Sequence, residues 1–292
     1  MNCLRSHREV PTPQSAALFV HVESDVFTAA ADCGRPRVVD MNADELSTLT
    51  ADPIQTLGMS FYFDPLTGER GKEHGLNIFE YYGLGRAGTM GDVDTDAVVE
   101  AFTFFNRPTI DFLWTKAKTK ADPVTIAADY VQAAYAFADR TFGGIDVAVL
   151  ARFASAARKV VDAAPSGQCP LVDGYKKFPA PANPVHAAYL GTIFLRELRG
   201  GVHIHAVDEA GLDTVAACYL QDPSVFTMHG YSDDDAPTMS DELTNKKRHA
   251  EALTDAAMEK CFDVLSDAER DALATGTRAM FEALKDPVAV AS

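Results

Sequence analysis

The sequence NPVHAAYLGTIFLRELRGG, residues 183–201, carries the clearest structural signal in this chain. Asparagine followed by proline is a typical helix start, because the asparagine side chain caps free amides and proline fits the first helical position. A glycine pair is a typical helix end. We therefore predict a helix from Val185 to Arg199 that ends at Gly200 and Gly201. Its apolar run, residues 187–195, is the longest in the chain and about half the ~20 residues needed to cross a bilayer.

The same signals predict further helices along the chain. Thr12 and Asp122 each precede a proline, and the capping-box spacing recurs at Asn42 with Glu45 and at Ser266 with Glu269. The predicted helices cover residues 16–31, a segment beginning near 42, 124–142, 145–164, 185–199, 241–265 and 267–284. Strand-like alternation is confined to residues 59–63 and 202–207. The sequence thus predicts an all-α protein, mainly a helical bundle, with at most a small β-ribbon or a vestigial winged-helix element.

Three stretches rich in glycine, proline or acidic residues separate these helices. They are residues 64–75, 165–183 and 221–239, and we predict loops in all three. The proline-rich stretch is the best boundary in the chain. We therefore expect an N-terminal helical half (residues 1–165), a connection (166–182) and a C-terminal helical half (183–292).

The composition limits the kinds of partner. The chain of 292 residues has 26 basic and 42 acidic residues, so its net charge is −16. Nucleic acids and anionic membranes are also negative, and we expect neither as a partner. The five cysteines are an odd number without a C-x-x-C pair, which suits a reducing compartment. The first residues lack the apolar core of a signal peptide, and the expected location is the cytoplasm.

Residues 196–209, RELRGGVHIHAVDE, hold the densest group of chemically active side chains. His203, His205 and Glu209 have the H-x-H-x3-E spacing with which cupin barrels bind a metal, but a cupin needs many strands. On a helix the two imidazoles point about 200° apart and do not share one ion. We therefore predict no metal site, and nothing in the sequence identifies a cofactor.

Two other segments have a familiar spacing. Gly83, Gly85 and Gly88 match G-x-G-x-x-G, but no βαβ pattern surrounds them. Small residues at these positions more often let two helices approach closely. The aromatic run Phe102–Phe105 stands before Asn106 and Pro108, and we interpret it mainly as core packing beside a helix break.

Several segments resemble a family from high-GC bacteria that is catalogued as helix-turn-helix or MarR-like proteins. The matching segments, in chain order, are YYGLGRAG at residues 81–88, AFTFFN at 101–106, PL at 170–171, FLRELRG at 194–200 with His203, and GLD at 211–213. The family also carries an E-A-x-T-D pattern in a C-terminal helix, matched by Glu251, Ala252, Thr254 and Asp255. The resemblance implies a mostly helical body and a small winged-helix-like element.

The chain departs from the family pattern at that element. After residues 230–234 the family continues with another helix and a wing, whereas this chain proceeds almost directly to the predicted helix at 241. The resemblance therefore implies a degenerate or truncated winged-helix region here, and it names no reaction.

We hypothesise a polar pocket that takes an anionic small molecule. Its candidate catalytic residues are His203 and Glu197, and its candidate substrate-binding residues are Arg196, Arg199, Arg86, Asn106 and His21. A histidine transfers protons near neutral pH, and paired arginines bind a carboxylate or phosphate. In this hypothesis the glycine pair reverses the chain and returns His203 to the helix end that carries both arginines.

The sequence leaves three alternative functions open. The first is a small-molecule-binding protein, and more narrowly an enzyme of accessory or secondary metabolism that uses this pocket. The second is a ligand-responsive MarR-like transcription regulator, which the high acidic charge and the lack of a basic helix disfavour. The third is a non-catalytic subunit of an oligomer, and a homodimer is compatible with each.

Overall fold

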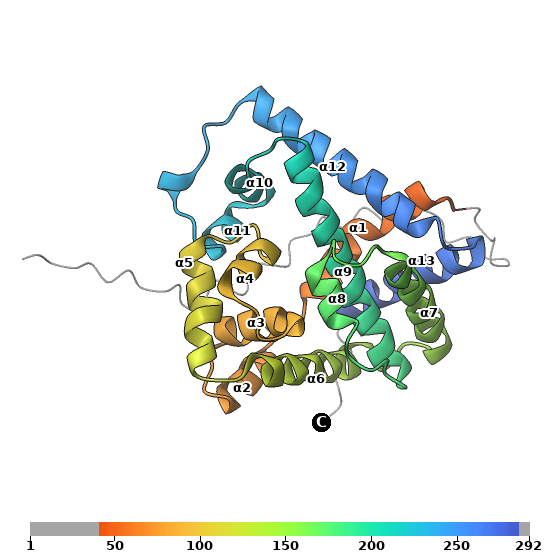
Figure 1. Ribbon diagram of the computed structural model, residues 1–292. Coiled ribbons are helices and arrows are strands. Elements are labelled where there is room, and N and C mark those ends of the chain that lie inside the picture. The colour runs from red at the N-terminus through yellow and green to blue at the C-terminus, as the bar shows by residue number, and fades with distance from the viewer. Residues whose placement is uncertain (1–40, 286–292) are drawn as a thin grey trace, which may run out of the picture. The chain divides into compact units, whose positions relative to one another are not determined.

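The computed structural model describes residues 41–285, and every regular element in that range is helical (Figure 1). The α-helices are α1 (Ala43–Met59), α2 (Pro65–Glu73), α3 (Ile78–Ala87), α4 (Thr95–Ala101), α5 (Arg107–Ile110), α6 (Pro123–Phe142), α7 (Val147–Ala163), α8 (Pro170–Tyr175), α9 (Pro184–Glu209), α10 (Thr214–Gln221), α11 (Pro223–Met228), α12 (Asp241–Phe262) and α13 (Asp267–Lys285). Four short turns of other helix types are η2 (Gly88–Met90), η3 (Asp111–Lys116), η4 (Ala117–Thr119) and η5 (Asp233–Asp235). The all-α prediction is confirmed over this range, and the helix predicted at 16–31 lies outside it.

Side-chain caps start most of these helices, as the sequence indicates. The Asn42 carboxamide accepts from the Glu45 amide at 2.8 Å, and the Glu45 carboxylate accepts from the Asn42 amide at 3.0 Å. Asp122 caps α6 and Asn183 caps α9, each with proline in the first turn. Capping satisfies amides that have no partner inside the helix, so it fixes where each helix begins.

Helix α9 is the central element. Every residue from Ala188 to Leu195 is buried, as expected of a helix that is apolar on all sides. It packs against α1, α6, α7, α8 and α12. Figure 1 shows α12 crossing beyond one end of α9, with α2 to α5 on the opposite side of the view from α7 and α13. Helices of both expected halves therefore pack together, and the boundary at residues 166–182 remains a prediction.

The predicted end of α9 at Gly200 and Gly201 is wrong. The helix continues through both glycines to Glu209. A glycine inside a helix costs only about 1 kcal/mol relative to alanine, so packing of the flanking turns outweighs it. At Gly201 a Cβ atom would lie 3.0 Å from the Cβ of Cys169, so this glycine allows the segment before α8 to approach α9 closely.

The two predicted strands and the three predicted loops also need correction. Residues 59–63 form the end of α1 and a turn, and residues 202–207 lie within α9, so no β-ribbon is present in residues 41–285. The stretch 64–75 is largely helix α2, and the other two stretches contain α8 and α11. Asp64 caps α2 with Pro65 at its first position, which is the same start signal as in α6 and α9. Gly71 of α2 leaves room for the ring of Tyr81 on α3.

The glycines of the G-x-G-x-x-G segment are contact points between helices, as interpreted from the sequence. A Cβ atom at Gly83 would overlap Leu113, one at Gly85 would overlap Tyr130, and one at Gly88 would overlap the Pro123 carbonyl. Small residues here bring α3 close to α6 and η3. This close approach places Arg86, between Gly85 and Gly88, in the interior.

Candidate functional site

Arg86 of α3 and Glu197 of α9 form a buried ion pair. Arg86 donates from Nε to Oε1 of Glu197 at 2.8 Å and from Nη2 to Oε2 at 2.7 Å. Arg196 donates from Nη1 to the same Oε1 at 3.0 Å, and Tyr62 donates its hydroxyl proton to that atom at 3.3 Å. The side chains of Arg86 and Glu197 are 9% and 1% exposed. Two guanidinium groups thus share one carboxylate, and the cluster carries a net positive charge.

The electrostatics of this cluster keep Glu197 ionised. Burial alone raises the pKa of Glu197, but the charges and hydrogen bonds of Arg86 and Arg196 outweigh burial and lower this pKa to about 2. Arg86 also donates from Nη1 to the Tyr82 hydroxyl at 3.0 Å, and its guanidinium lies 4.5 Å from the centre of the Phe102 ring. A carboxylate held in this way orients the guanidinium groups and gives up no proton at neutral pH.

Three buried polar groups near the cluster have no hydrogen-bond partner among the described residues. They are Nε of Arg196 and the hydroxyls of Tyr130 and Tyr175. The charges of Tyr62 and Arg86 act on both hydroxyls, which places them in the same region, and burial raises the pKa of each tyrosine well above its usual value. An unpaired polar group in the interior is costly. The region therefore offers three hydrogen-bonding groups to water or a ligand.

Two of the segments that carry the family resemblance, residues 195–203 and 251–255, contact each other. Arg199 on α9 lies 3.6 Å from Oε2 of Glu251 and 3.2 Å from Oδ1 of Asp255, both on α12. His203, one helical turn further along α9, has its Nδ1 atom 2.9 Å from the Thr254 hydroxyl. The L-R-E-x-R-G-x-x-H segment thus packs on the E-A-x-T-D segment.

These contacts correct the expected arrangement of the arginines. Arg196 and Glu197 join the buried cluster with Arg86, whereas Arg199 faces α12 and is held by its carboxylates. The chain does not reverse at the glycine pair, so His203 lies beyond Arg199 on the same helix. The structure brings together Arg86, Arg196 and Glu197, and it places the side chains of Arg199 and His203 against α12.

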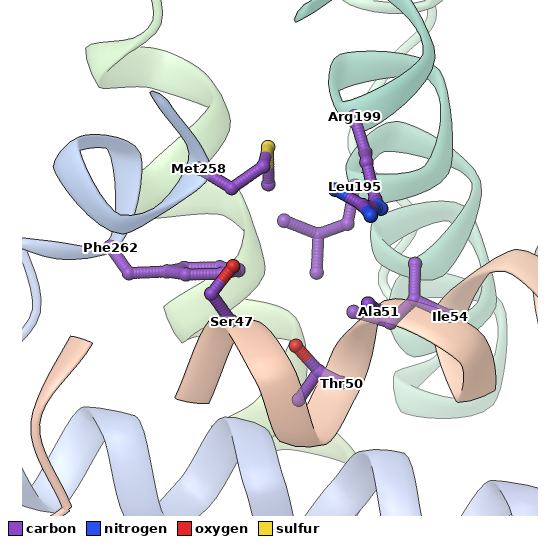
Figure 2. Close-up of a pocket in the computed structure, with 8 residues that line it drawn as sticks. All are labelled: Ser47, Thr50, Ala51, Ile54, Leu195, Arg199, Met258 and Phe262. Atoms are coloured by element: carbon purple, nitrogen blue, oxygen red, sulfur yellow. The ribbon is translucent and has the colours of Figure 1, made fainter. Parts of the chain in front are cut away.

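Arg199 also borders a small cavity between α1, α9 and α12, shown in Figure 2. The eight lining residues are Ser47, Thr50, Ala51, Ile54, Leu195, Arg199, Met258 and Phe262. The centre of a water molecule can occupy about 10 Å³ of it, which is room for roughly one water. This cavity is too small for a substrate.

The protonation state of His203 follows from its neighbour. The Thr254 hydroxyl donates its one proton to the Ala250 carbonyl at 2.7 Å, so the Nδ1–H of His203 must be the donor to Thr254. Burial lowers the pKa of His203; the charge of Glu251 opposes this shift, and the charges of Arg199 and Lys247 act in the same direction as burial. The imidazole is therefore neutral at pH 7, with a lone pair on Nε2 that accepts no hydrogen bond from the described residues.

The aromatic run after α4, residues 102–105, contacts Arg86 and two histidines. Phe102 lies under Arg86, the Phe104 ring centre is 5.8 Å from that of His203, and the Phe105 ring centre is 3.9 Å from that of His229. The run is core packing, as interpreted from the sequence. It also joins the buried cluster to the face of α9 that carries His203.

His229 is a site residue that the sequence interpretation missed. Its ring lies 3.2 Å, through Nδ1, from the Cys218 sulfur, and it bonds to the backbone of Phe104. Burial, with the charges of Arg86 and Arg196, lowers the pKa of His229 to about 3, and burial raises that of Cys218 to about 12. The thiol thus stays protonated and is a poor nucleophile. No sequence motif marks this pair, because its members come from α10 and the end of α11.

Two remaining candidates have other positions. Asn106 caps α5, where its side-chain oxygen accepts from the Thr109 amide at 2.9 Å and its side-chain nitrogen donates to the Gly230 carbonyl. Its role in this structure is to hold the turn that follows α11. His21 lies outside the described residues. Tyr62, like His229, was missed, since nothing in residues 59–63 distinguishes it from core aromatics.

Gly200 leaves an open space on α9. No described atom lies within 4 Å of the position that a Cβ atom would take there. Arg196 and His203 are seven residues apart, so they lie on nearly the same helix face about 10 Å apart, with Gly200 between them. The Arg196 side chain packs against Gly58 of α1, and its guanidinium lies over the Tyr62 ring and bonds to Glu197.

Metal-binding groups do not gather in residues 41–285. No group of three or more histidine, cysteine or carboxylate side chains there is arranged so that it could hold a metal ion. His203 bonds to Thr254, whereas His205 points elsewhere and its Nε2 lies 3.1 Å from the Gln168 carbonyl. No helix in the described range is long and apolar enough to span a membrane.

Comparison with known proteins gives one match. A family model described as a helix-turn-helix family matches residues 47–291, which is most of the chain. Searches of the curated proteins and of the solved structures found no match.

Proposed function

This chain belongs to the helix-turn-helix family, and we propose that it binds a small anionic molecule at the cluster of Arg86, Arg196 and Glu197. One observation carries the proposal. Two guanidinium groups share a single buried carboxylate, and Nε of Arg196 has no hydrogen-bond partner among the described residues. A second anion would balance the remaining charge and accept the unused donors, since guanidinium groups bind carboxylate and phosphate strongly.

The neighbouring side chains support roles in this site. Glu197 positions both arginines, because its pKa of about 2 keeps it ionised. His203 presents a neutral Nε2, which is the state of a proton acceptor, and Thr254 fixes its tautomer through Nδ1. We propose that this protein is an enzyme in which Nε2 of His203 takes a proton from an anion held by Arg86 and Arg196. Arg199 holds α12 in place.

Thermal unfolding and isothermal titration calorimetry test the anion site. The probes are inorganic phosphate, acetate and benzoate, each against the sodium chloride background. Arg196→Met keeps a side chain of similar length over Tyr62 and removes the charge. Arg152→Met, an exposed residue of α7, is the matched control. We expect at least one anion to raise the Tm of the parent and of the control but not of Arg196→Met. The proposal fails if no anion binds, or if binding is unchanged in Arg196→Met.

Family membership favours a second candidate, a ligand-responsive transcription regulator of MarR-like type. Helices α10 and α11 are short and joined at Asp222, which ends the first and caps the second. Residues 214–228 contain no lysine or arginine, however, and a DNA-reading helix normally presents several to phosphates. On α12, Lys247 donates to the Leu220 carbonyl of α10.

A gel-shift assay with the DNA upstream of the chain's own gene separates the two candidates. The ligand-binding proposal predicts no sequence-specific complex at physiological salt. A complex that resists competitor DNA, and that the anion releases, would favour the regulator.

A further inference from the structure

We propose that the cavity between α1, α9 and α12 is a binding site for one ordered water molecule, which links Arg199 to two hydroxyl groups of α1. This site is separate from the guanidinium cluster and does not depend on the proposed anion. The inference is carried by the size of the cavity, by the charges around Arg199 and by a buried donor at the cavity wall that has no acceptor.

Three polar side chains line this cavity. Thr50 and Ser47 of α1 are 1% and 3% exposed, and Nη1 of Arg199 is buried without a hydrogen-bond partner among the described residues. Figure 2 shows the two hydroxyl groups reaching the cavity from α1 and the Arg199 guanidinium reaching it from α9. A buried donor without an acceptor is costly, so a molecule that accepts from Nη1 here stabilises the folded chain.

The charges around Arg199 favour a neutral occupant. Its Nη1 lies 3.2 Å from Oδ1 of Asp255, and its Nη2 lies 3.6 Å from Oε2 of Glu251. Two carboxylates thus face one guanidinium, and the excess negative charge repels an anion. A cation would meet the guanidinium itself at the cavity wall. A neutral molecule avoids both penalties.

The hydrogen-bonding groups of the wall match those of water. Thr50 donates its proton to the Leu46 carbonyl at 2.7 Å, so its oxygen can act as an acceptor towards the cavity. A water molecule accepts from Nη1 of Arg199, donates to Oγ1 of Thr50 and makes its third bond with the Ser47 hydroxyl. Three bonds are typical of a buried water. The rest of the wall is apolar and consists of Ala51, Ile54, Leu195, Met258 and Phe262.

The size of the cavity limits the occupant to a single water. The volume of about 10 Å³ open to the centre of a water molecule is close to the minimum that one bound water needs. An organic molecule does not fit unless side chains move. The inferred water makes Arg199 a junction of three helices, because its ion pairs reach α12 and its water reaches α1.

A high-resolution crystal structure of the whole chain tests the site directly. We expect one peak of electron density in the cavity, at hydrogen-bond distance from Nη1 of Arg199 and Oγ1 of Thr50. Crystals soaked in sodium bromide distinguish water from an anion, because bromide is visible by its anomalous scattering. A cavity without density, or one that takes up bromide, would overturn the proposal.

Thr50→Val and Thr50→Ile test the water in solution. Both lose the hydroxyl and its bond to Leu46, and isoleucine extends one carbon further than valine at the cavity wall. In an empty cavity this carbon would raise the ratio of folded to unfolded chain about fourfold, the usual effect of burying one methylene group. We expect the opposite order, because isoleucine displaces the water and leaves Nη1 of Arg199 without an acceptor.

Thr277 of α13 provides the matched control. It is also fully buried and donates to the carbonyl four residues earlier, that of Leu273, at 2.8 Å, but it does not line the cavity. Urea unfolding should show that Thr50→Val lowers the ratio of folded to unfolded chain about fivefold more than Thr277→Val, since only Thr50 also bonds to the water. Equal losses at the two positions, or an isoleucine variant more stable than the valine variant, would overturn the water site.

Discussion

His203 on α9 donates a hydrogen bond from Nδ1 to the hydroxyl of Thr254 on α12, across 2.9 Å. The direction of this bond is fixed because the hydroxyl proton of Thr254 goes to the Ala250 carbonyl. A single threonine thus sets the tautomer of the imidazole. It also joins two helices that are far apart in the sequence.

Replacing this threonine by valine should lower the free energy of unfolding. Thr254→Val keeps the shape but leaves the Nδ1–H of His203 without an acceptor, which costs about 1–3 kcal/mol. Urea unfolding monitored by circular dichroism measures the change. Thr244→Val, on the exposed part of the same helix, should stay within about 0.5 kcal/mol of the parent. Equal losses in both variants would contradict the assigned bond.

Neutralising Glu197 should be much more costly. Glu197→Gln removes the one negative charge that Arg86 and Arg196 share in the interior, and uncompensated buried charge costs about 3–5 kcal/mol. Chemical denaturation at pH 7 gives the value, with Glu282→Gln, at an exposed position of α13, as the control. A loss no larger than in the control would show that the cluster is hydrated and contributes little.

The stability of the fold should decrease as the pH falls from 6.5 towards 3. The pKa of His229 is about 3 in the folded chain and near 6.5 in the unfolded chain, so the unfolded chain binds more protons in this range. The stability from a neutral His229 is present above pH 6.5 and is lost below it, by at most about 1.4 kcal/mol per pH unit. His229→Gln removes this contribution, and its unfolding free energy should depend less steeply on pH. Parallel pH curves for the parent and the variant would refute this.

The two adjacent glycines of α9 should respond in opposite ways to alanine. Gly200→Ala should raise the free energy of unfolding by roughly 0.5–1 kcal/mol, because the position is helical and open. Gly201→Ala should lower it, since the new Cβ would press on Cys169. Thermal and urea unfolding of the pair give the comparison. Destabilisation by Gly200→Ala would mean that the space at this position is already filled.

Helix starts were predictable from the sequence, and helix ends were less so. Asn42, Asp122 and Asn183 each cap a helix as predicted, because capping depends on a few neighbouring residues. Gly200 and Gly201 were wrong as a stop, because the packing of α9 against α8 and α12 outweighs the local preference of glycine. Asp64 and Pro65 had the same start signal, but the glycines that follow them suggested a loop.

The candidate site was predictable only where its members are close in sequence or carry opposite charges. Arg196, Glu197 and Arg86 meet as one cluster, and opposite charges inside a protein must find each other. The partners of Arg199 and His203 on α12 were named from the resemblance, but contact between the two segments depends on tertiary packing. Tyr62 and His229 carry no local signal, since aromatic and histidine side chains are common in cores.

The continuity of α9 through its glycine pair has a mechanical consequence. The helix has 26 residues and is about 39 Å long, so it is one continuous rigid element from Pro184 to Glu209. Glu197 lies about 18 Å from that far end, and a 5° tilt about Glu197 therefore displaces Glu209 by about 1.5 Å. A small change in the orientation of α9 at Arg86 and Glu197 therefore produces a larger displacement at the far end of the helix, where α10 and α12 begin.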